Sequence, residues 1–286
     1  MPIDPKKLLA LQIPDIDHRF TEKDTILYAL GIGLGQDPMD VRQLAFVYEK
    51  ELKAFPTFAN SLGYSPFWLR NLDTGIDFNK VVHGEHSLTL HRPVPVRGHV
   101  IGKGRILDVI DKGPGRGALV LSERRIVEAQ SGAEIATVLQ TTFCRGDGGF
   151  GGAKREQDAP HPIPAREPDA ACVLATRPET ALIHRLSGDL NPLHAEPAYA
   201  RAAGFERPIL HGLASFGIAA HAILKTMCDY DPARLRSIAG RFSAPVVPGE
   251  SIRVEMWRDG RVVSFRASSV ESGALAMSNG RAELRE

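Results

Sequence analysis

The sequence predicts an α+β fold in which one unit, helical sequence followed by an antiparallel meander, occurs twice. Three observations predict this fold: a Gly- and Pro-rich break near the middle of the chain, similar segments on either side of it, and a strongly apolar helical segment in the second half. The length of 286 residues suits two domains of roughly 100–150 residues, and each of them can bury a core.

The break lies at residues 145–170. A cluster of glycines at residues 146–152 is followed by spaced prolines, which are Pro160, Pro162, Pro164 and Pro168. Such a composition sustains neither a helix nor a strand. We therefore predict an N-terminal repeat at residues 1–145, a linker at residues 146–171 and a C-terminal repeat at residues 172–286.

The two halves share local sequence features. Residues 91–98 resemble residues 242–249, and a Ser-Gly-Ala turn precedes the last strand of each half, at residues 131–133 and 272–274. Segments that mix β-branched or aromatic residues with polar alternation are predicted to be strands; they span residues 120–127, 136–143, 252–257 and 262–268. Between the last two segments, Asp259-Gly260 is typical of a two-residue hairpin turn.

The helical segment at residues 213–224 is apolar on nearly all sides, which predicts a buried helix. An antiparallel sheet wrapped around a long buried helix, in each of two halves, is the double hot-dog arrangement. In the N-terminal half, residues 55–62 are the candidate for the equivalent helix. The predicted fold is therefore a double hot-dog, with two antiparallel sheets that each wrap around a long helix.

Composition excludes several classes of function. The formal net charge of +1 provides no basic surface for nucleic acid and no polybasic patch for a membrane. No apolar run approaches the roughly 20 residues of a membrane-spanning helix, and the first residues lack the pattern of a signal peptide. The final Leu284-Arg285-Glu286 is not a peroxisomal address, and three cysteines at unrelated spacings imply neither disulfides nor a metal site. These features predict a cytoplasmic protein that binds neither nucleic acid nor membranes.

The densest cluster of chemical groups contains Asp189, Asn191 and His194. Gly188 ends a preceding short helix and Pro192 prevents its resumption, so the three side chains lie on an irregular turn where they can converge. A carboxylate and an imidazole that meet at one water molecule form a general acid–base pair. The alternative interpretation is an ordinary Asx turn, with Asp and Asn as caps.

Residues 208–212 lead directly into the apolar helix. Gly212 would place a backbone N–H at the helix N-terminus, which suits an oxyanion that develops on a thioester carbonyl. Alternatively, the glycine only permits a tight entry to a buried helix. For His211, a capping or packing role is favoured over a catalytic one.

The chain resembles a known enzyme family at these positions. Residues 187–194 match the pattern Ser-Gly-Asp-x-Asn-Pro-apolar-His, and residues 208–212 match Pro-Ile-x-His-Gly, which together are the signature of MaoC-like, (R)-specific enoyl-CoA hydratases (hydratase 2). Segments 28–31, 55–58 and 82–85 resemble the N-terminal half of the two-hot-dog members, such as the hydratase part of peroxisomal multifunctional enzyme type 2. One departure is Leu190, where eukaryotic members often carry Trp.

The resemblance implies a hydro-lyase that hydrates trans-2-enoyl-CoA reversibly to (3R)-3-hydroxyacyl-CoA in acyl-CoA metabolism. It implies Asp189 and His194 as the catalytic pair, Asn191 as an orienting partner and the Gly212 amide as the oxyanion donor. Neither a metal nor a redox cofactor is needed, because CoA arrives as part of the substrate. The expected partner is an acyl-CoA, and the expected assembly is a homodimer.

His83 and Gly84, with His211, are predicted to contribute to substrate binding. On the resemblance, His83 and Gly84 border the acyl-CoA channel close to the active site of the other half. The alternative is a solvated loop that leads into a strand at residues 87–90.

The repeat also predicts how many working sites the chain has. Shifting the C-terminal motif back by 155 positions pairs Gly188 with Gly33, and it places Leu34, Gln36 and Met39 where the acid, amide and base would be. One active site per chain follows. Leu34 and Met39 are predicted to leave room for the acyl tail, which favours medium- or long-chain substrates.

Three alternative functions are considered. Within enzymes, the chain could work as a dehydratase on a hydroxyacyl or methyl-branched dicarboxylic CoA thioester. From another class, it could be a non-catalytic acyl-thioester binding or scaffold subunit, which the presence of both Asp189 and His194 disfavours. A hot-dog thioesterase is disfavoured because the acid–base turn precedes the buried helix.

Overall fold

The computed structural model describes residues 3–65, 67–151 and 159–286. The α-helices are α1 (Pro5–Leu9), α2 (Glu22–Leu30), α3 (Val41–Val47), α4 (Trp68–Asn71), α5 (Thr180–His184), α6 (Pro197–Ala202) and α7 (Gly212–Met227). Short 3-10 helices are η1 (Pro56–Ser61), η2 (Phe78–Lys80), η3 (Arg185–Ser187), η4 (Pro192–His194) and η5 (Pro232–Arg234). The strands are β1 (Ile16–Phe20), β2 (Val81–Leu90), β3 (Gly98–Asp111), β4 (Ala118–Glu128), β5 (Glu134–Cys144), β6 (Ala170–Ala175), β7 (Leu235–Phe242), β8 (Ser251–Asp259), β9 (Val262–Ser269) and β10 (Leu275–Leu284).

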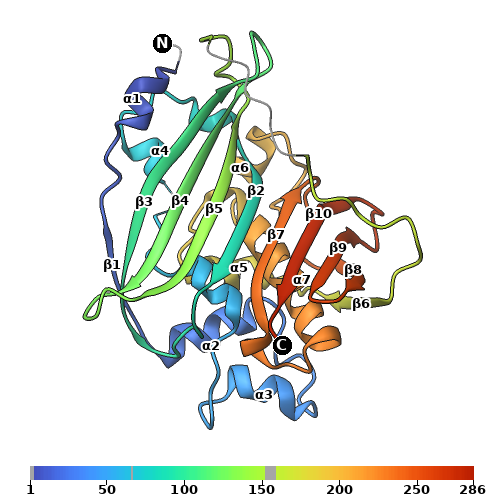
Figure 1. Cartoon of the computed structure of the whole chain (residues 1–286). Coiled ribbons are helices and arrows are strands. Elements are labelled where there is room, and N and C mark those ends of the chain that lie inside the picture. Colours follow the sequence, from blue (N-terminus) through green and yellow to red (C-terminus); the bar gives the residue numbers. More distant parts are fainter. Residues whose placement is uncertain (1–2, 66, 152–158) are drawn as a thin grey trace.

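One continuous antiparallel sheet contains both halves of the chain, in the order β1-β3-β4-β5-β2-β7-β10-β9-β8-β6. The halves join where β2 pairs with β7, from Glu85 opposite Arg241 to Thr89 opposite Ser237. Figure 1 shows the green N-terminal strands and the red C-terminal strands side by side across this junction. The two predicted sheets are therefore two halves of a single sheet.

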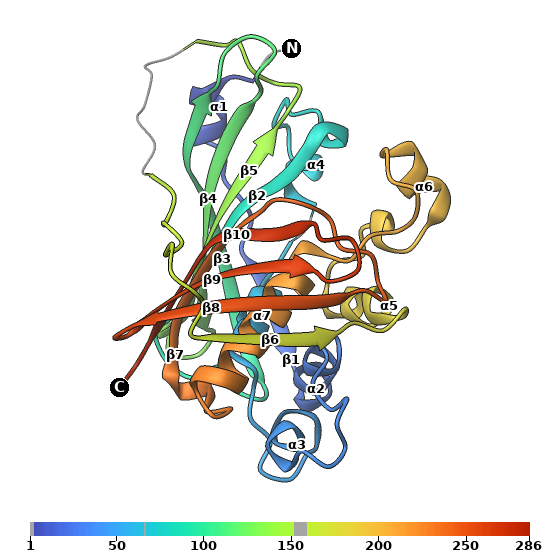
Figure 2. The ribbon, with the colours of Figure 1, turned by 90° about the vertical axis from the view of Figure 1, so that its right-hand side faces the viewer.

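Helix α7 is the buried helix that the apolar segment predicts. All but four of its sixteen residues are buried, and Figure 2 shows it behind the C-terminal strands, which curve over it. Gly217 lets the helix approach the N-terminal half, because a Cβ at this position would lie 2.6 Å from Cγ2 of Ile32. The double hot-dog class is confirmed, with α7 as the enclosed helix of the C-terminal half.

Among the described residues of the N-terminal half, no long helix is enclosed by the sheet. The segment predicted for it forms only the 3-10 helix η1, which begins at Pro56 and is buried. Directly after η1, Gly63 passes so close to β3 that a Cβ there would lie 2.6 Å from backbone atoms of Gly102. This contact leaves no room for a helix to continue. The expectation of a long helix in this half is therefore wrong, and part of the inner sheet face is left to line cavities.

The two copies of the repeat keep one more feature in common. Helices α2 and α5 contact each other, and each is followed by a glycine in the left-handed region, Gly33 with φ +85° and Gly188 with φ +117°. These glycines are the pair that the shift of 155 residues relates.

The segment between the repeats runs from the end of β5 at Cys144 to the start of β6 at Ala170, just before the predicted repeat boundary at residue 172. Within the predicted linker, residues 152–158 lie outside the described residues. The later part of the linker packs along β8, where Trp257 Nε1 donates a hydrogen bond to the Arg166 carbonyl. Among the described residues, no helix combines the length and the hydropathy required to cross a bilayer.

Candidate active site

A turn between η3 and η4 carries the predicted acid and base. Gly188 takes the left-handed conformation after η3, and Pro192 begins η4. The Asp189 carboxylate accepts a hydrogen bond from the backbone N–H of Asn191 at 3.2 Å. In turn, the side-chain Oδ1 of Asn191 accepts one from the backbone N–H of Leu193 at 3.1 Å. The turn is therefore an Asx turn and a candidate active site at once. Asn191 acts through the backbone, since it caps the short helix that contains His194.

His194 is held in one tautomer by its surroundings. Its Nδ1–H donates to the carbonyl of Ile209 at 2.8 Å, so Nε2 carries the free lone pair. Burial lowers the pKa of His194 below its usual value, against the opposing effects of the Ile209 carbonyl and the Asp189 carboxylate. A neutral imidazole beside a carboxylate is ready to accept a proton from water.

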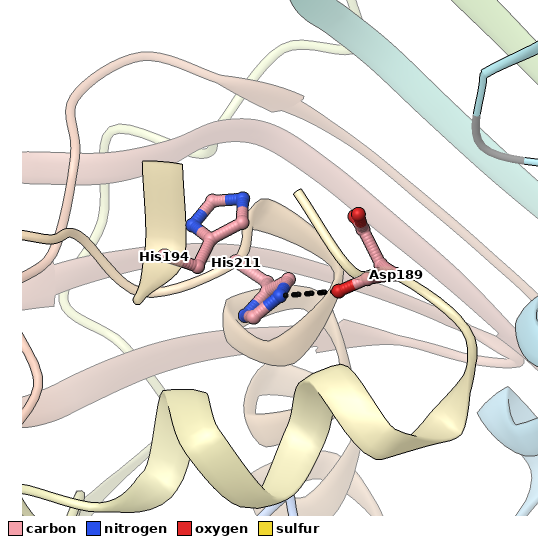
Figure 3. A group of neighbouring side chains, drawn as sticks. All are labelled: Asp189, His194 and His211. Atoms are coloured by element: carbon pink, nitrogen blue, oxygen red, sulfur yellow. Dashed lines mark hydrogen bonds between the residues drawn. The ribbon is translucent and has the colours of Figure 1, made fainter. Parts of the chain in front are cut away.

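His211 contacts both His194 and Asp189 (Figure 3). Its ring stacks on His194, with centroids 3.7 Å apart and an interplanar angle of 28°, and its Nε2–H donates to the Asp189 carbonyl at 3.1 Å. The residue is 1% exposed, and burial, together with the neighbouring His194 and His184, lowers its pKa to about 2. These contacts give His211 a positioning role at the turn, and its contribution to substrate binding stays a prediction.

The cluster also has the donor set of a metal site. One ligand atom each from Asp189, His194 and His211 lies within 4.8 Å of the others, and zinc accepts such donors. The two imidazoles, however, are stacked in nearly parallel planes. Lone pairs in parallel planes do not converge on one ion as tetrahedral coordination requires. The arrangement suits acid–base chemistry better than metal binding.

Gly212 is the first residue of α7, so its N–H has no acceptor within the helix. The glycine is tightly packed, because a Cβ at this position would lie 3.2 Å from Cε1 of Phe242. A free amide at the positive end of a sixteen-residue buried helix is a suitable donor to an oxyanion.

His83 and Gly84 lie within β2, so the alternative of a solvated loop is wrong. Gly84 occupies an irregularity in the pairing of β2 with β5, where a Cβ would lie 3.1 Å from the Thr141 carbonyl oxygen. The His83 ring packs on the ring of Phe242 at 4.7 Å between centroids, and burial lowers its pKa to about 4. Because Phe242 also lies against Gly212, one aromatic ring separates His83 from the predicted oxyanion donor.

Two cavities lie at the N-terminal half, and the larger one reaches the turn. This cavity, of about 290 Å³, is lined by residues 186–188, which directly precede Asp189, together with Phe58 and Tyr64. The smaller, of about 50 Å³, shares Tyr64 and is also lined by Arg124 and Gln140. Sequence reasoning did not identify Tyr64 or Arg124. The signal available for Arg124 was the strand alternation, which places it on the same face as the buried Val120 and Ile126.

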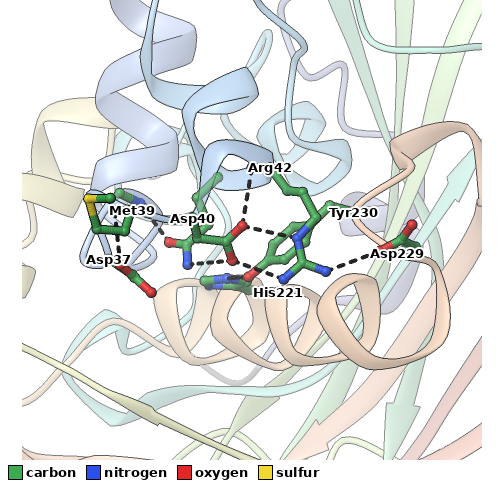
Figure 4. A network of polar contacts seen from close by, with 9 residues as sticks. Asp37, Met39, Asp40, Arg42, His221, Asp229 and Tyr230 are labelled. Atoms are coloured by element: carbon green, nitrogen blue, oxygen red, sulfur yellow. Dashed lines mark hydrogen bonds and ion pairs between the residues drawn. The ribbon is translucent and has the colours of Figure 1, made fainter.

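The residues expected to replace the second acid and base do not line either cavity. Leu34 is buried in the main core, and Met39 is 84% exposed. Figure 4 shows Met39 next to a polar network in which Arg42 binds Asp40 and Asp229. The prediction that Met39 lines the acyl pocket is therefore wrong, because residues 37–42 form a surface connection to the end of α7.

The fold and the site together define a class. A carboxylate and a neutral imidazole beside the N-terminus of the enclosed helix of a double hot-dog have the arrangement that the predicted hydro-lyase requires. Comparison with known proteins identifies the family within this class. Residues 18–146 match the MFE-2 hydratase 2 N-terminal domain, and residues 156–279 match the MaoC-like domain.

Individual relatives agree along nearly the whole chain. The peroxisomal enoyl-CoA hydratase 2 of Arabidopsis thaliana is 37% identical over 285 residues, which is 92% of this chain and 90% of the relative. The 3-hydroxyacyl-thioester dehydratase Y of Mycobacterium tuberculosis is 39% identical over 96% of this chain and 95% of its own. A crystal structure of a MaoC-like dehydratase from Phytophthora capsici superposes with a TM-score of 0.87 at 33% identity, covering 98% of both chains. The chain belongs to the MaoC-like hydratase 2 family and is an enzyme of the hydro-lyase kind.

Proposed function

We propose that this enzyme adds water reversibly to trans-2-enoyl-CoA thioesters and forms (3R)-3-hydroxyacyl-CoA. The observation that carries the proposal is the free Nε2 of a neutral His194 next to the Asp189 carboxylate. His211 holds the turn in place through its hydrogen bond to the Asp189 carbonyl. The relatives named enoyl-CoA hydratase 2 and 3-hydroxyacyl-thioester dehydratase support the same chemistry in its two directions.

The residues divide the reaction between them. Asp189 and His194 hold one water molecule, His194 Nε2 takes a proton from it, and the oxygen bonds to C3 of the substrate. The electron pair of the C2–C3 double bond moves into the thioester, whose enolate oxygen accepts a hydrogen bond from the Gly212 amide. Protonation of C2 by the pair restores the thioester and regenerates the free base. Dehydration is the same sequence in reverse, so the geometry serves both directions.

The acyl chain is proposed to enter the two cavities at the N-terminal half. Tyr64 borders both cavities, and the larger of them is also lined by Gly188, the residue before Asp189. Leu34 is buried in the core and Met39 is exposed, so neither residue supports a preference for medium or long chains. The residues that line these two cavities are therefore the better indication of which acyl chain the enzyme binds.

A homodimer in a reducing compartment such as the cytoplasm completes the proposal. Large apolar side chains near the catalytic turn are exposed in the single chain, namely Leu182, Leu186, Leu190 and Tyr199. A second copy that covers them would remove this apolar surface from water. The three cysteines are buried and unpaired, as in proteins of reducing compartments. Size-exclusion chromatography with light scattering measures the molar mass and tests the dimer. The mass of a monomer at micromolar concentration would contradict it.

A stereochemical assay tests the central proposal. Loss of the enoyl-thioester absorbance should report hydration of trans-2-enoyl-CoA. When the reaction is coupled to an S-specific 3-hydroxyacyl-CoA dehydrogenase, no NADH should form, whereas an R-specific dehydrogenase should produce it. A signal from the S-specific enzyme would refute the proposed product.

A further inference from the structure

Arg124 lies on the inner face of the N-terminal half of the sheet. Along β4, Val120 and Ile126 are fully buried on this face, and the period of two places Arg124 on the same side. The neighbours Glu123 and Arg125 point to the other face, where they pair with Arg105 and Glu134. The cationic side chain of Arg124 therefore lies on the face of β4 that otherwise carries the buried hydrophobic residues Val120 and Ile126.

The surroundings of Arg124 are polar, and the one carboxylate residue that lines the smaller cavity with it, Glu123, pairs with Arg105 instead. Its Nη2 donates to the Asn60 carbonyl at 2.6 Å, its guanidinium lies 4.7 Å from the centroid of the Tyr64 ring, and His86 is a neutral neighbour. The buried Nε has no hydrogen-bond partner. Across the described part of the chain, Arg124 forms no ion pair. Burial lowers the pKa of Arg124 to about 10, so the group remains charged at neutral pH.

A row of polar side chains continues from Arg124 across the inner face. His86 of β2 is opposite Gln140 of β5, and Gln140 is opposite Ser122 of β4, two residues before Arg124. Ser122, Arg124 and Gln140 line the smaller cavity. His86 and Gln140 are hydrogen-bonded to Asn60 and Thr142. An apolar acyl tail at this level would leave the buried Nε of Arg124 without a partner, which costs free energy. The inner face is thus suited to a polar ligand.

The same cavity is connected to the reaction centre. Tyr64 lines both cavities, and the larger one is also lined by Leu186, Ser187 and Gly188, which directly precede Asp189. The Tyr64 ring lies 4.7 Å from the Arg124 guanidinium, so this one side chain lies between the start of the turn and Arg124. A thioester whose C2 and C3 lie at Asp189 can therefore direct the far end of its acyl chain past Tyr64 to Arg124.

We propose that Arg124 binds a carboxylate at the far end of the acyl chain, so that the substrates are CoA half-thioesters of unsaturated dicarboxylic acids. This inference rests on the proposed function and names its substrate class. The guanidinium offers the planar, paired donors that a carboxylate accepts. A carboxylate would supply the missing partner of the Nε and the missing negative charge in one group. The cavity of about 50 Å³ has room for such a group, since a single water molecule needs only about 10–15 Å³.

The test compares three thioesters of equal chain length: trans-2-hexenedioyl-CoA, its methyl ester at the free carboxyl, and trans-2-hexenoyl-CoA. The wild-type enzyme should prefer the free diacid by at least ~10-fold in kcat/KM, as expected for a hydrogen-bonded charge pair. Arg124→Met should bring the ratio of diacid to methyl ester close to one, and Arg124→Lys should restore part of the preference. Arg125→Met is the matched control on the outer face of the same strand and should retain the full preference.

The outcomes separate this inference from the proposed function. If the wild-type enzyme hydrates hexenoyl-CoA as well as the diacid, the carboxylate site is refuted while the hydratase activity stands. If Arg124→Met lowers kcat/KM equally for all three thioesters, Arg124 acts on the CoA phosphates or on the reacting atoms, and the inference is also refuted. If no thioester is hydrated, the proposed function fails. Calorimetric binding of saturated hexanedioyl-CoA against its methyl ester then still decides whether Arg124 selects a carboxylate.

Discussion

The ring of His211 lies 3.7 Å from that of His194, and it is fixed by a hydrogen bond to the backbone carbonyl of Asp189. The neutral ring of His211 therefore contacts both residues of the pair: it stacks on the ring of His194 and is hydrogen-bonded to the backbone of Asp189. The pKa of His211, lowered to about 2, keeps it neutral when His194 accepts a proton. The proton therefore stays on His194, from which it can return to the substrate.

The first prediction concerns the catalytic pair. Asp189→Asn and His194→Gln should each fold as the wild type does and lose at least ~10²-fold in kcat, because each removes one member of an acid–base pair. Rates are measured on an enoyl-CoA that the wild type hydrates, and circular dichroism checks the fold. A folded variant with near-full activity would remove that residue from the mechanism.

The second prediction isolates the amide hydrogen of Gly212. Proline is tolerated at the first position of a helix, and the extended ψ of 136° at His211 permits a following proline. Gly212→Pro should therefore fold and lose ~10²–10³-fold in kcat, the usual effect of removing one oxyanion donor. Gly212→Ala is the matched control, since its Cβ meets Phe242 in the same way but its N–H remains. Equal losses in the two variants would assign the effect to packing.

The third prediction concerns acid stability. Burial lowers the pKa of His184 to about 3 and that of His221 to about 4, with the pKa of His211 at about 2. Each value lies below the unfolded value of 6.5, so below about pH 6.5 the unfolded chain binds protons that the folded chain does not. The free energy of unfolding should be constant above about pH 6.5 and should fall on acidification, by up to ~1.4 kcal/mol per pH unit for each histidine.

Urea unfolding between about pH 7.5 and pH 5 measures this slope. His221→Leu should be less stable at neutral pH, since it loses hydrogen bonds to Tyr230 and to the Ile32 carbonyl. The same variant should nevertheless lose less stability on acidification than the wild type does. A stability that stays level down to about pH 5 would show that these histidines are not buried in their neutral form.

The fourth prediction is that Arg124→Met raises the melting temperature of the ligand-free enzyme. An unpaired buried cation is destabilising, and an apolar side chain of similar length removes its desolvation cost. We expect a gain of roughly 1–3 kcal/mol in the free energy of unfolding. Differential scanning calorimetry measures the change against Arg125→Met, which removes only an exposed pair with Glu134. A lower melting temperature for Arg124→Met alone would indicate that Arg124 is a structural residue.

The parts of the site that sequence reasoning located are those that local rules determine. Gly188 must be followed by a turn because it takes a left-handed conformation, and Pro192 fixes the start of η4. The uniformly apolar segment of α7 likewise predicts burial without reference to the rest of the chain. These signals located the turn and the buried helix, and the resemblance to the hydratase family predicted that Asp189, His194 and Gly212 share one site.

The parts that were missed depend on contacts distant in sequence. The short η1 follows from the approach of Gly63 to Gly102, which no local pattern reveals. Met39 was misplaced because the repeat is preserved in helices α2 and α5 but diverges in the loops that follow them. Arg124 could be assigned to an inner face by alternation, yet its lack of a partner appears only when Asn60 and Tyr64 surround it.

The pairing of β2 with β7 joins two copies of one unit within a single polypeptide. In an assembly of two identical chains, every substitution is inherited by both copies, so a change that improves one site alters its twin. Covalent fusion removes that constraint. We expect one copy to retain the chemical apparatus while the other differs from it, as the short η1 and Arg124 on the inner face of β4 do here. Substrate choice could then change in one half without altering the reacting groups of the other.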